Sequence, residues 1–264
     1  MIIENSWKLK SLNKKLTLRD GELHIWRTKV SKNEYNLEFY WNLLSQDEQV
    51  RAKEFYFVRD RNRYIIARGI LRSLIANYAG ITPENILFKY TEYGKPYLAV
   101  NNNLSEIKFN LAHSKDSIVY AFTKNIDVGI DIEFINKDFV IEDVVNYCCS
   151  KQEQSILQKL SRFEKHYYFY KLWVIKEALV KAMGIGLSYD LRQIHINFGK
   201  NKLINPINII NNDKISWTTD VFWSYNGYYS AFVTREQIAR VFFLLFRNRD
   251  KQLNTFLFDF ILSR

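Results

Sequence analysis

Two carboxylates separated by one residue occur in the segment Val128-Gly-Ile-Asp-Ile-Glu133. Side chains of a β-strand alternate between its two faces, so Asp131 and Glu133 should project together while Ile130 and Ile132 face the other way. Two like charges held this close repel each other unless a cation lies between them, and Mg²⁺ prefers oxygen ligands from carboxylates, water and phosphate. The spacing therefore favours a metal site, although an exposed strand face with two acids is the commoner meaning of such a hexapeptide taken alone.

A carboxylate and two amines lie close together in a second segment, residues 172–184. Its apolar residues recur at helical spacing, which predicts a helix with one face in a core. Glu177 and Lys181 lie four residues apart on another face, and Lys176 lies beside them. On an isolated helix such a pair is usually a surface ion pair worth about 0.2–0.5 kcal/mol. Beside a metal-bound diphosphate, the same groups could take the proton of a hydroxyl and neutralise charge on phosphoryl oxygens.

Two shorter segments carry groups that suit an anion. Phe109-Asn-Leu-Ala-His-Ser114 is a predicted strand that runs into a turn and presents His113 and Ser114 as donors. A single histidine is, however, more often a packed and hydrogen-bonded residue than a ligand. Tyr93-Gly-Lys-Pro96 is a turn whose glycine and proline restrict the backbone while Lys95 reaches outward. Neither segment is specific on its own.

The chain is basic, with 38 Lys and Arg against 28 Asp and Glu, a formal net charge of +10. This charge favours anionic partners, which include nucleic acid, anionic membrane, a phosphorylated cofactor and an acidic protein. The predicted helix after Phe57 is rich in arginine, whose guanidinium group suits phosphate, although a solvated helix face explains it about equally well. The arginines are Arg59, Arg61, Arg63, Arg68 and Arg72.

The elements expected to position these groups occur in two similar series. The first series consists of a strand at 21–30, helices at 45–55 and 61–78, and strands at 86–90, 108–111 and 117–123. The second consists of a strand at 127–134, helices at 140–147, 150–160 and 164–184, and strands at 193–198, 215–225 and 228–234. We therefore predict an α+β fold of two tandem halves, residues 1–124 and 125–264. The apolar and basic tail after residue 235 is expected to form a helix packed on the core.

Composition indicates a packed globular protein, because 47% of the residues are hydrophobic and 16% are aromatic, with only three prolines. The N-terminal segment lacks the unbroken apolar core of a secretory signal, and no apolar run approaches the roughly 20 residues of a membrane span. We therefore expect a soluble, cytoplasmic protein. The only cysteines are the neighbours Cys148 and Cys149, which are expected to be structural thiols rather than a disulfide or a zinc site.

Four motifs in this order resemble the Sfp-type 4′-phosphopantetheinyl transferase family over about residues 44–198. They are Gly94-Lys-Pro96, Phe109-Asn-Leu-x-His-Ser114, Gly129-Ile-Asp-Ile-Glu133 and Trp173-x-x-Lys-Glu-Ala-x-x-Lys-x-x-Gly184. The resemblance implies transfer of the phosphopantetheine arm of coenzyme A (CoA) to a serine of an acyl or peptidyl carrier protein, with 3′,5′-ADP released. It also implies two similar α+β halves with pseudo-twofold symmetry and the active site in the cleft between them.

The same resemblance implies roles for individual residues. Asp131, Glu133 and Glu153 would bind Mg²⁺, with Mn²⁺ as the alternative metal. Glu177 would act as the general base and Lys181 as its electrostatic partner. The residues that would contact CoA are Arg51, Arg63, Gly94, Lys95, Pro96, His113, Lys176 and Lys181.

Two residues depart from the family's pattern, and each could weaken the binding of CoA. Ala112 stands where the family often has a serine, and Glu48 stands where it has a lysine.

Two other functions stay open on the sequence. A basic nucleic-acid-binding protein would use its arginines on phosphates and its aromatics for base stacking, but this leaves the strand acids unexplained. A non-catalytic relative that still binds carrier proteins is the other alternative, for which Ala112 is the one hint. The expected partners are CoA and an acidic carrier protein, without nucleic acid or membrane. Two fused halves can complete a site within one chain, so we expect a monomer.

Overall fold

The computed structural model of the protein describes residues 9–11, 15–99, 106–186, 189–196, 198, 208–209, 217–248 and 256–263. Its first part contains β1 (Leu9–Ser11), β2 (Glu22–Lys29), α1 (Leu37–Leu43), α2 (Gln46–Lys53), α3 (Val58–Ala79), β3 (Phe88–Tyr90), β4 (Pro96–Leu98), β5 (Ile107–Ser114) and β6 (Ser117–Lys124). Its second part contains β7 (Val128–Phe134), α4 (Glu142–Cys148), α5 (Lys151–Gln158), α6 (Arg162–Met183), β8 (Ile194–His195), β9 (Asn208–Ile209), β10 (Thr218–Tyr225), β11 (Tyr228–Thr234), β12 (Arg240–Asn248) and β13 (Phe256–Ser263). Short 3-10 helices are η1 (Val30–Lys32), η2 (Glu34–Asn36), η3 (Pro83–Asn85) and η6 (Leu191–Gln193).

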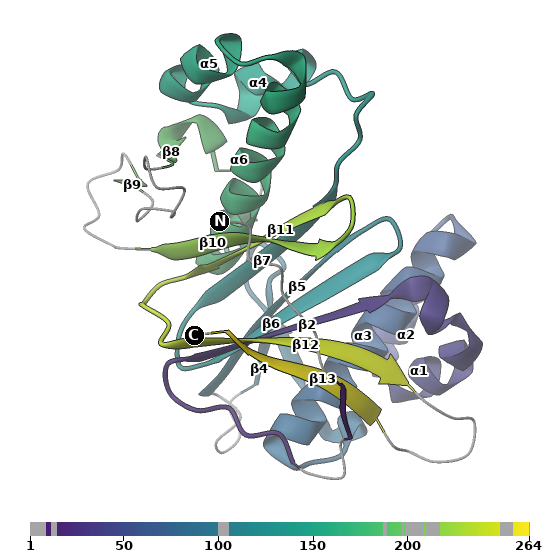
Figure 1. The fold of residues 1–264 in the computed structure, drawn as a ribbon. Helices are drawn as coiled ribbons and strands as arrows, with labels where there is room; N and C mark the ends of the chain where they lie inside the picture. The colour runs from purple at the N-terminus through teal and green to yellow at the C-terminus, as the bar shows by residue number, and fades with distance from the viewer. Residues whose placement is uncertain are drawn as a thin grey trace.

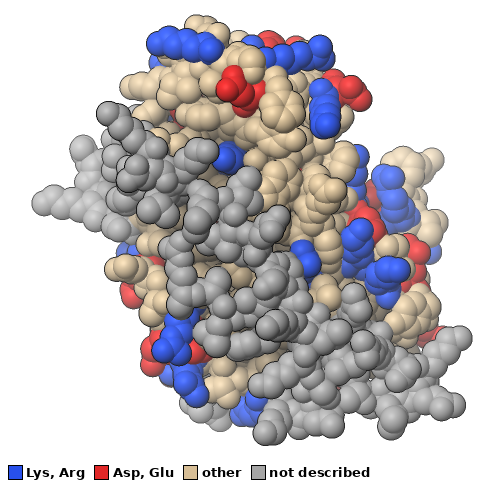
Figure 2. All heavy atoms as spheres, in the orientation of Figure 1, with Lys and Arg blue, Asp and Glu red and all other residues tan. Residues whose placement is uncertain are grey.

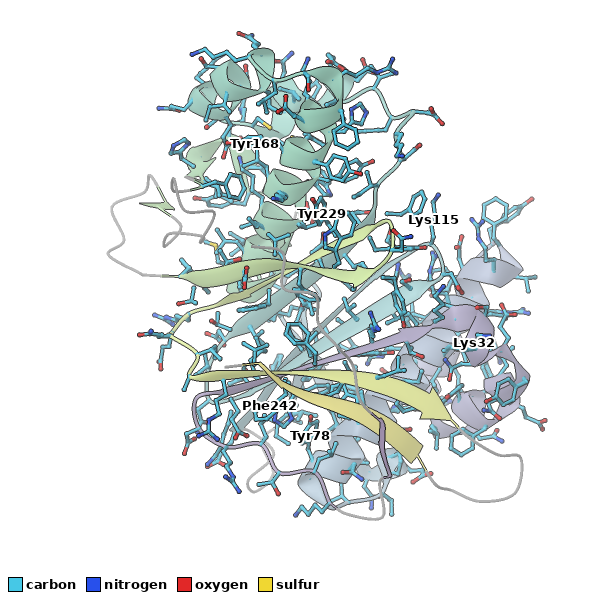
Figure 3. The ribbon with its side chains drawn as sticks, viewed as in Figure 1. Lys32, Tyr78, Lys115, Tyr168, Tyr229 and Phe242 are labelled. Atoms are coloured by element: carbon cyan, nitrogen blue, oxygen red, sulfur yellow. The ribbon has the colours of Figure 1, made fainter. Side chains whose placement is uncertain are left out.

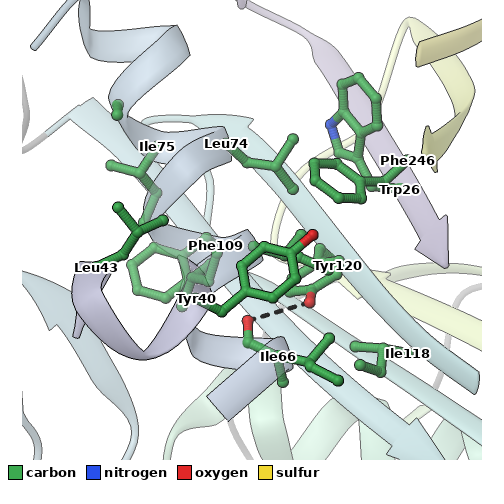
Figure 4. Close-up of a cluster of buried hydrophobic side chains, with 14 of the residues drawn as sticks. Trp26, Tyr40, Leu43, Ile66, Leu74, Ile75, Phe109, Ile118, Tyr120 and Phe246 are labelled. Atoms are coloured by element: carbon green, nitrogen blue, oxygen red, sulfur yellow. Dashed lines mark hydrogen bonds between the residues drawn. The ribbon is translucent and has the colours of Figure 1, made fainter. Parts of the chain in front are cut away.

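A six-stranded sheet in the order β1-β13-β12-β2-β6-β5 forms the centre of the first half, with α1 and α3 packed on one of its faces (Figure 1). Alternate residues of β2, such as Trp26, join the core under these helices. Figure 4 shows this core, in which Tyr40, Phe109 and Tyr120 pack together. The Tyr120 hydroxyl donates a hydrogen bond of 3.1 Å to the Ala67 carbonyl oxygen, so the one polar group at the end of this ring has a partner.

A three-stranded sheet in the order β10-β11-β7 forms the second half, and α6 packs on its outer face. Tyr229 of β11 and Tyr168 of α6 lie in this layer (Figure 3), and the Tyr229 ring lies 5.9 Å from that of Tyr167. The helices α4 and α5 lie at the end of α6 away from the large sheet (Figure 1). None of the helices in the described ranges has the length and apolar character needed to cross a bilayer.

The two halves meet where β5 and β7 lie side by side. The backbone N–H of Ile130 donates to Asn110 Oδ1 at 2.9 Å, and that of Phe134 donates to Ser114 Oγ at 3.1 Å. Ile130 and Ile132 pack into an apolar cluster shared with the large sheet, as the alternation along the strand predicts. Lys115, at the turn after β5, places its Nζ 3.4 Å from the centroid of the Phe134 ring (Figure 3). The predicted α+β fold with two similar halves is therefore confirmed.

The predicted helix in the C-terminal tail is wrong, because this segment forms β12 and β13. β12 pairs in parallel with β2 and antiparallel with β13, so it is an interior strand of the first half's sheet. Phe242 faces the core under α1 and α3, whereas Phe243 faces the cluster between the sheets. A strand covered on both faces has a continuous apolar run, which sequence periodicity alone does not distinguish from a buried helix.

The two halves repeat one local arrangement. In each, a serine begins a short helix with a capping box, Ser45 with Glu48 before α2 and Ser150 with Glu153 before α5. Each is followed by a 22-residue helix, α3 or α6, that ends at a glycine with positive φ. Glu48 pairs with Arg68 and Arg72 of α3, both at 2.5 Å, and Glu153 pairs with Lys176 of α6 at 2.6 Å. Arg72 and Lys176 each lie about two helical turns before their glycine.

The second sheet touches α6 most closely at Gly129. A Cβ atom at this position would lie 1.9 Å from the Ala178 carbonyl oxygen and 2.5 Å from the Ala182 nitrogen. Both neighbours are backbone atoms of α6, which cannot rotate away as the end of a side chain can. Only glycine therefore permits β7 and α6 to pack at this distance.

The substitution Gly129→Ala should cost about 3 kcal/mol of unfolding free energy or more, at or above the upper end of the usual overpacking cost, because the clash is with backbone. Urea denaturation followed by circular dichroism measures the change. The neighbouring Ile130→Val substitution is the control and should cost about 0.5–1.5 kcal/mol. A Gly129→Ala protein as stable as the control would contradict this account of the packing.

Candidate active site

Three carboxylates and one amine converge where α6 crosses β7. Asp131 and Glu133 project from β7 toward the helix, and Glu177 and Lys181 lie one helical turn apart on α6. Lys181 Nζ donates to Asp131 Oδ1 at 2.6 Å, and Asp131 is 4% exposed. We call Asp131, Glu133 and Glu177 the acid cluster. The structure thus brings together the two carboxylates of the strand motif and the two charged residues of the helix motif.

Two neighbouring side chains orient Glu133. Ser114 Oγ donates to Glu133 Oε2 at 2.9 Å and also accepts the N–H of Phe134. Burial and the charge of Asp131 raise the pKa of Glu133, and hydrogen bonds from Ser114 and Trp173 oppose this rise only in part. The sequence predicted Ser114 as a donor to an anion, and in the structure its acceptor is a carboxylate of the protein itself.

The acid cluster resists carrying three negative charges. Burial, together with the negative charges of Asp131 and Glu133, raises the pKa of Glu177 to about 7 despite the nearby Lys181 cation. Burial and the charge of Asp131 raise the pKa of Glu133, and burial raises that of Asp131 against the opposing effect of Lys181. Burial disfavours the Lys181 cation, but Asp131 and the other two acids outweigh it and raise its pKa. The cluster has one amine for three acids and would be stabilised by a further positive charge.

Two oxygens of the cluster are buried without a hydrogen-bond partner, Asp131 Oδ2 and Glu177 Oε1. Unpaired buried carboxylate oxygens are costly, so these atoms are suited to bind a cation. In the part of the chain that the structure describes, no group of three or more acidic, histidine or cysteine side chains has an arrangement that could hold a metal ion. The donor set nevertheless fits a hard divalent ion such as Mg²⁺, which takes one or two carboxylates and keeps water and phosphate as its other ligands.

A cavity of about 840 Å³ opens beside the acid cluster and is lined by both halves of the protein. Lys181 contributes from α6, and the other lining residues belong to the first half. Six of the residues expected to contact CoA lie on its wall: Arg51, Arg63, Gly94, Pro96, His113 and Lys181. Arg63 is held by Asp60 at 2.7 Å, which leaves its guanidinium with further donors for an anion.

His113 is neutral in this environment. The His113 side chain keeps contact with solvent, but protein atoms of the cavity wall surround much of the ring. This partial loss of water, followed by the charges of Arg63 and Lys181, lowers the pKa of His113 to about 4. Near neutral pH the imidazole is therefore an uncharged hydrogen-bond donor among cations.

Lys95 does not lie in this cavity. Its Nζ donates to the carbonyl oxygens of Ala182 at 2.9 Å and Val128 at 3.3 Å, so it joins β4 and its turn to α6 and β7. Burial lowers the pKa of Lys95 to about 8. The residue lines a second cavity of about 370 Å³, whose wall includes none of the acid cluster. Its side chain points inward, whereas the sequence predicted one that reaches outward.

Glu153 and Lys176 also lie away from the acid cluster. Glu153 is fully buried, and its oxygens accept from Lys176 Nζ at 2.6 Å and from the backbone N–H groups of Ser150 and Ile196. Lys176 Nζ donates in addition to the carbonyls of Cys148 and Leu191. Both residues thus use their polar atoms within the fold. The structure does not bring Glu153 to the other two predicted metal ligands, or Lys176 to the cavity, because α6 turns Lys176 away from Glu177.

The two departures from the motif pattern have different positions. Ala112 is a buried residue of the cavity wall, so a serine at this position would add its hydroxyl to that wall. Glu48 is buried between Arg68 and Arg72 and helps hold α2 on α3. Sequence reasoning missed Asn110, which binds the backbone of β7, although it is part of the Phe109–Ser114 motif.

Comparison with known proteins identifies similar chains. A family model described as the 4′-phosphopantetheinyl transferase superfamily matches residues 127–233, and one described as the 4′-phosphopantetheinyl transferase N-terminal region matches residues 25–125. The chain is 34% identical to 4′-phosphopantetheinyl transferase HetI of Nostoc sp. over 74% of this chain and 81% of that protein. It is 32% identical to 4′-phosphopantetheinyl transferase Sfp of Bacillus subtilis over 58% of this chain and 66% of that protein. It is 26% identical to L-aminoadipate-semialdehyde dehydrogenase-phosphopantetheinyl transferase of Mus musculus over 63% of this chain and 54% of that protein.

The substitution Glu48→Gln should destabilise the protein by about 3–5 kcal/mol, because it leaves two buried arginines without a counter-charge. The exposed pair of Arg51 and Glu54 provides the control, and Glu54→Gln should change stability by less than about 1 kcal/mol. Urea denaturation of both variants measures the difference. Equal effects would show that the buried triad adds no more than a surface pair.

The raised pKa of Glu177 predicts how stability depends on pH without metal. The folded state holds this proton up to about pH 7, whereas the ordinary carboxyl value is 4.5. The contribution of the Glu177 proton to the free energy of unfolding is therefore complete below pH 4.5 and is lost as pH rises to about 7. In EDTA, the wild type should lose more unfolding free energy between pH 5 and pH 8 than Glu177→Gln, which has no proton to release. Identical losses in urea denaturation would refute the assignment.

Proposed function

The chain belongs to the 4′-phosphopantetheinyl transferase superfamily, and from this premise we propose that it transfers the phosphopantetheine arm of CoA to a serine hydroxyl of a carrier protein, releasing 3′,5′-ADP. The observation that carries the proposal is the position of the acid cluster, with its two unpaired buried oxygens, beside a cavity whose wall includes the cations Arg51, Arg63, Arg68 and Lys181. Such a site combines a place for a divalent ion with a place for phosphates.

Asp131, Glu133 and Glu177 would hold the cation, with Glu177 taking the place that the sequence assigned to Glu153. The proposal rests on the unpaired oxygens of Asp131 and Glu177 and on the mutual repulsion of the three acids. When bound, a divalent ion would neutralise these carboxylates and stabilise negative charge on the diphosphate of CoA. Ser114 and Trp173 would keep Glu133 oriented for this role.

The phosphate groups of CoA would be bound by the side chains of the large cavity. Arg51 and Arg63 offer guanidinium donors, Lys181 offers an ammonium group, and His113 offers a neutral N–H. Lys95 and Lys176 are omitted from this set because their ammonium groups already bind backbone carbonyls. Lys95 instead would hold the turn that places Gly94 and Pro96 on the cavity wall.

Glu177 would also take the proton of the carrier serine, directly or through a water molecule. The serine oxygen then forms a bond to the β-phosphorus of CoA while the bond from that phosphorus to the bridging oxygen breaks, and the electron pair leaves with 3′,5′-ADP. Lys181 lies one turn from Glu177 and lines the cavity, so it would balance the charge that develops on the phosphoryl oxygens. Catalysis of this kind is mainly positioning and electrostatic stabilisation.

Both halves of the proposed site come from one chain, so we expect the working unit to be a monomer. Size-exclusion chromatography with light scattering would contradict this by showing a stable dimer.

The intact mass of an apo carrier protein, incubated with this chain, CoA and Mg²⁺, tests the proposed reaction. We expect a gain of one phosphopantetheine, loss of that gain in EDTA, and a fall in turnover of at least about 100-fold in Glu177→Gln. Glu164→Gln, an exposed residue at the start of α6, is the matched control and should retain activity. No gain with several unrelated carriers would refute transfer and favour a non-catalytic carrier-binding relative.

A further inference from the structure

One edge of β7 faces the first half of the protein. β7 pairs with β11 along its other edge, so in the described part of the chain alternate backbone N–H groups of β7 point to β5 without joining a sheet with it. The N–H of Ile130 donates to Asn110 Oδ1 at 2.9 Å. The N–H of Phe134 donates to Ser114 Oγ at 3.1 Å. Side chains of β5 thus bind the backbone of β7, and we call this contact the seam.

The two hydrogen bonds of the seam bracket the acids of β7. Asn110 binds the residue before Asp131, and Ser114 binds the residue after Glu133. Ser114 also donates to the Glu133 carboxylate, whereas Asn110 acts on the backbone. The short segment between the two bonds therefore contains both strand carboxylates, and its position relative to β5 is set at each end.

The same stretch of β5 forms part of the wall of the large cavity. Side chains of a strand alternate, so Asn110, Ala112 and Ser114 lie on the face of β5 that meets β7. Ala112 lines the cavity between the two anchoring residues, and the next residue, His113, lines it as well. One strand thus connects the wall proposed for the phosphates with the strand that carries the two acids.

The groups proposed to act on one diphosphate come from different halves. Arg51 and Arg63 line the cavity from α2 and α3, a region where Figure 2 shows basic side chains at the surface beside uncharged ones. The ladder with β11 and the packing of Gly129 on α6 fix β7 within the second half. Ile130 also packs into the apolar cluster across the seam, but apolar packing is not directional. The hydrogen bonds of the seam supply a directional link between the acids and the cations.

We propose that Asn110 is a positioning residue for the transfer reaction, which holds the acids of β7 in register with the phosphate-binding wall of the first half. The inference rests on the proposed function and adds a residue to which that function assigned no role. Asn110 and Ile130 are both buried, so loss of the acceptor would leave a buried N–H without a partner. β7 then shifts toward another acceptor, and the acids no longer lie where a cation and the phosphates assist each other's binding.

Calorimetric titration with CoA, in EDTA and again in Mg²⁺, tests this role without requiring transfer. In the wild type Mg²⁺ should tighten the binding of CoA. Asn110→Leu has a side chain of similar size without the acceptor. It should keep the affinity in EDTA within about twofold, whereas the gain in affinity from Mg²⁺ should be at least about fivefold smaller than in the wild type. Asn110→Asp keeps an oxygen at the acceptor position and should retain more of this gain.

A substitution on the far strand of the same small sheet separates positioning from general loosening. Thr219 of β10 is buried, and its hydroxyl donates to the Phe232 carbonyl oxygen at 2.6 Å. Thr219→Val should lower the temperature of unfolding as Asn110→Leu does, because each variant loses one buried hydrogen bond. The gain from Mg²⁺ should nevertheless stay within about twofold of the wild type in Thr219→Val, since the seam is intact. An equal loss of the gain in both variants would overturn the proposal.

Steady-state kinetics at saturating CoA, Mg²⁺ and carrier protein give a second readout. Asn110→Leu should lower kcat by at least about tenfold, because a misplacement of about 1 Å can cost about 100-fold. The KM for the carrier should stay within about twofold. Unchanged kcat together with an unchanged gain from Mg²⁺ would overturn the proposal, as would equal losses in Asn110→Leu and Asn110→Asp.

The calorimetric result distinguishes failure of this inference from failure of the proposed function. If the wild type modifies no carrier protein, the proposed function fails, and the gain from Mg²⁺ in wild type and Asn110→Leu still decides the role of Asn110. A wild type whose affinity for CoA is the same in EDTA and in Mg²⁺ would overturn the inference even if transfer were observed.

Discussion

The candidate active site depends on the point where the backbones of β7 and α6 meet with no side chain between them. Gly129 lies against Ala178 and Ala182, which are the neighbours of Glu177 and Lys181 in the helix. Because Asp131 and Glu133 follow Gly129 on the same face of the strand, this contact sets how closely the acids of the two elements approach. The close packing of strand and helix buries the three carboxyl groups, and this burial is the main reason that their pKa values are raised. Repulsion from neighbouring acids adds to the effect for Glu133 and Glu177, and Lys181 offsets only part of it.

The repeated ion pairs show how one scaffold supports two different surfaces. Each half buries a carboxylate from a capping box against a basic residue of its long helix, and each pair fixes a short helix to a long one. The residue after Lys176 is the charged Glu177, whereas the residue after Arg72 is the uncharged Ser73. The second half therefore contributes the acid cluster, and the first half contributes most of the cavity wall. Glu153 and Lys176 use their polar atoms within this pair and its backbone contacts, so they have none left for a ligand.

Much of the fold and part of the candidate site could be predicted from the sequence. The period of two along β7 predicted which face carries Asp131, and helical spacing predicted that Glu177 and Lys181 share a face. The charges of Glu153 and Lys176 could not be placed, because residue spacing does not say whether a charged group is buried against a partner from a distant segment. Lys95 was misjudged for the same reason, since its carbonyl acceptors lie in the second half. The prediction of a helix in the C-terminal tail failed because a buried strand and a buried helix both have continuous apolar runs.

The place of β12 in the large sheet has a consequence for how the protein is made. β12 lies between β2 and β13, so β2 is a sheet edge until residues 240–248 have been synthesised. A ribosome extends the chain by about 5–20 residues per second, and the whole second half must emerge before that edge is covered. An apolar strand with unpaired backbone groups is a template for pairing with other chains. The nascent first half is therefore expected to need chaperone protection. That need should end when β12 and β13 pair with the sheet and cover the edge of β2.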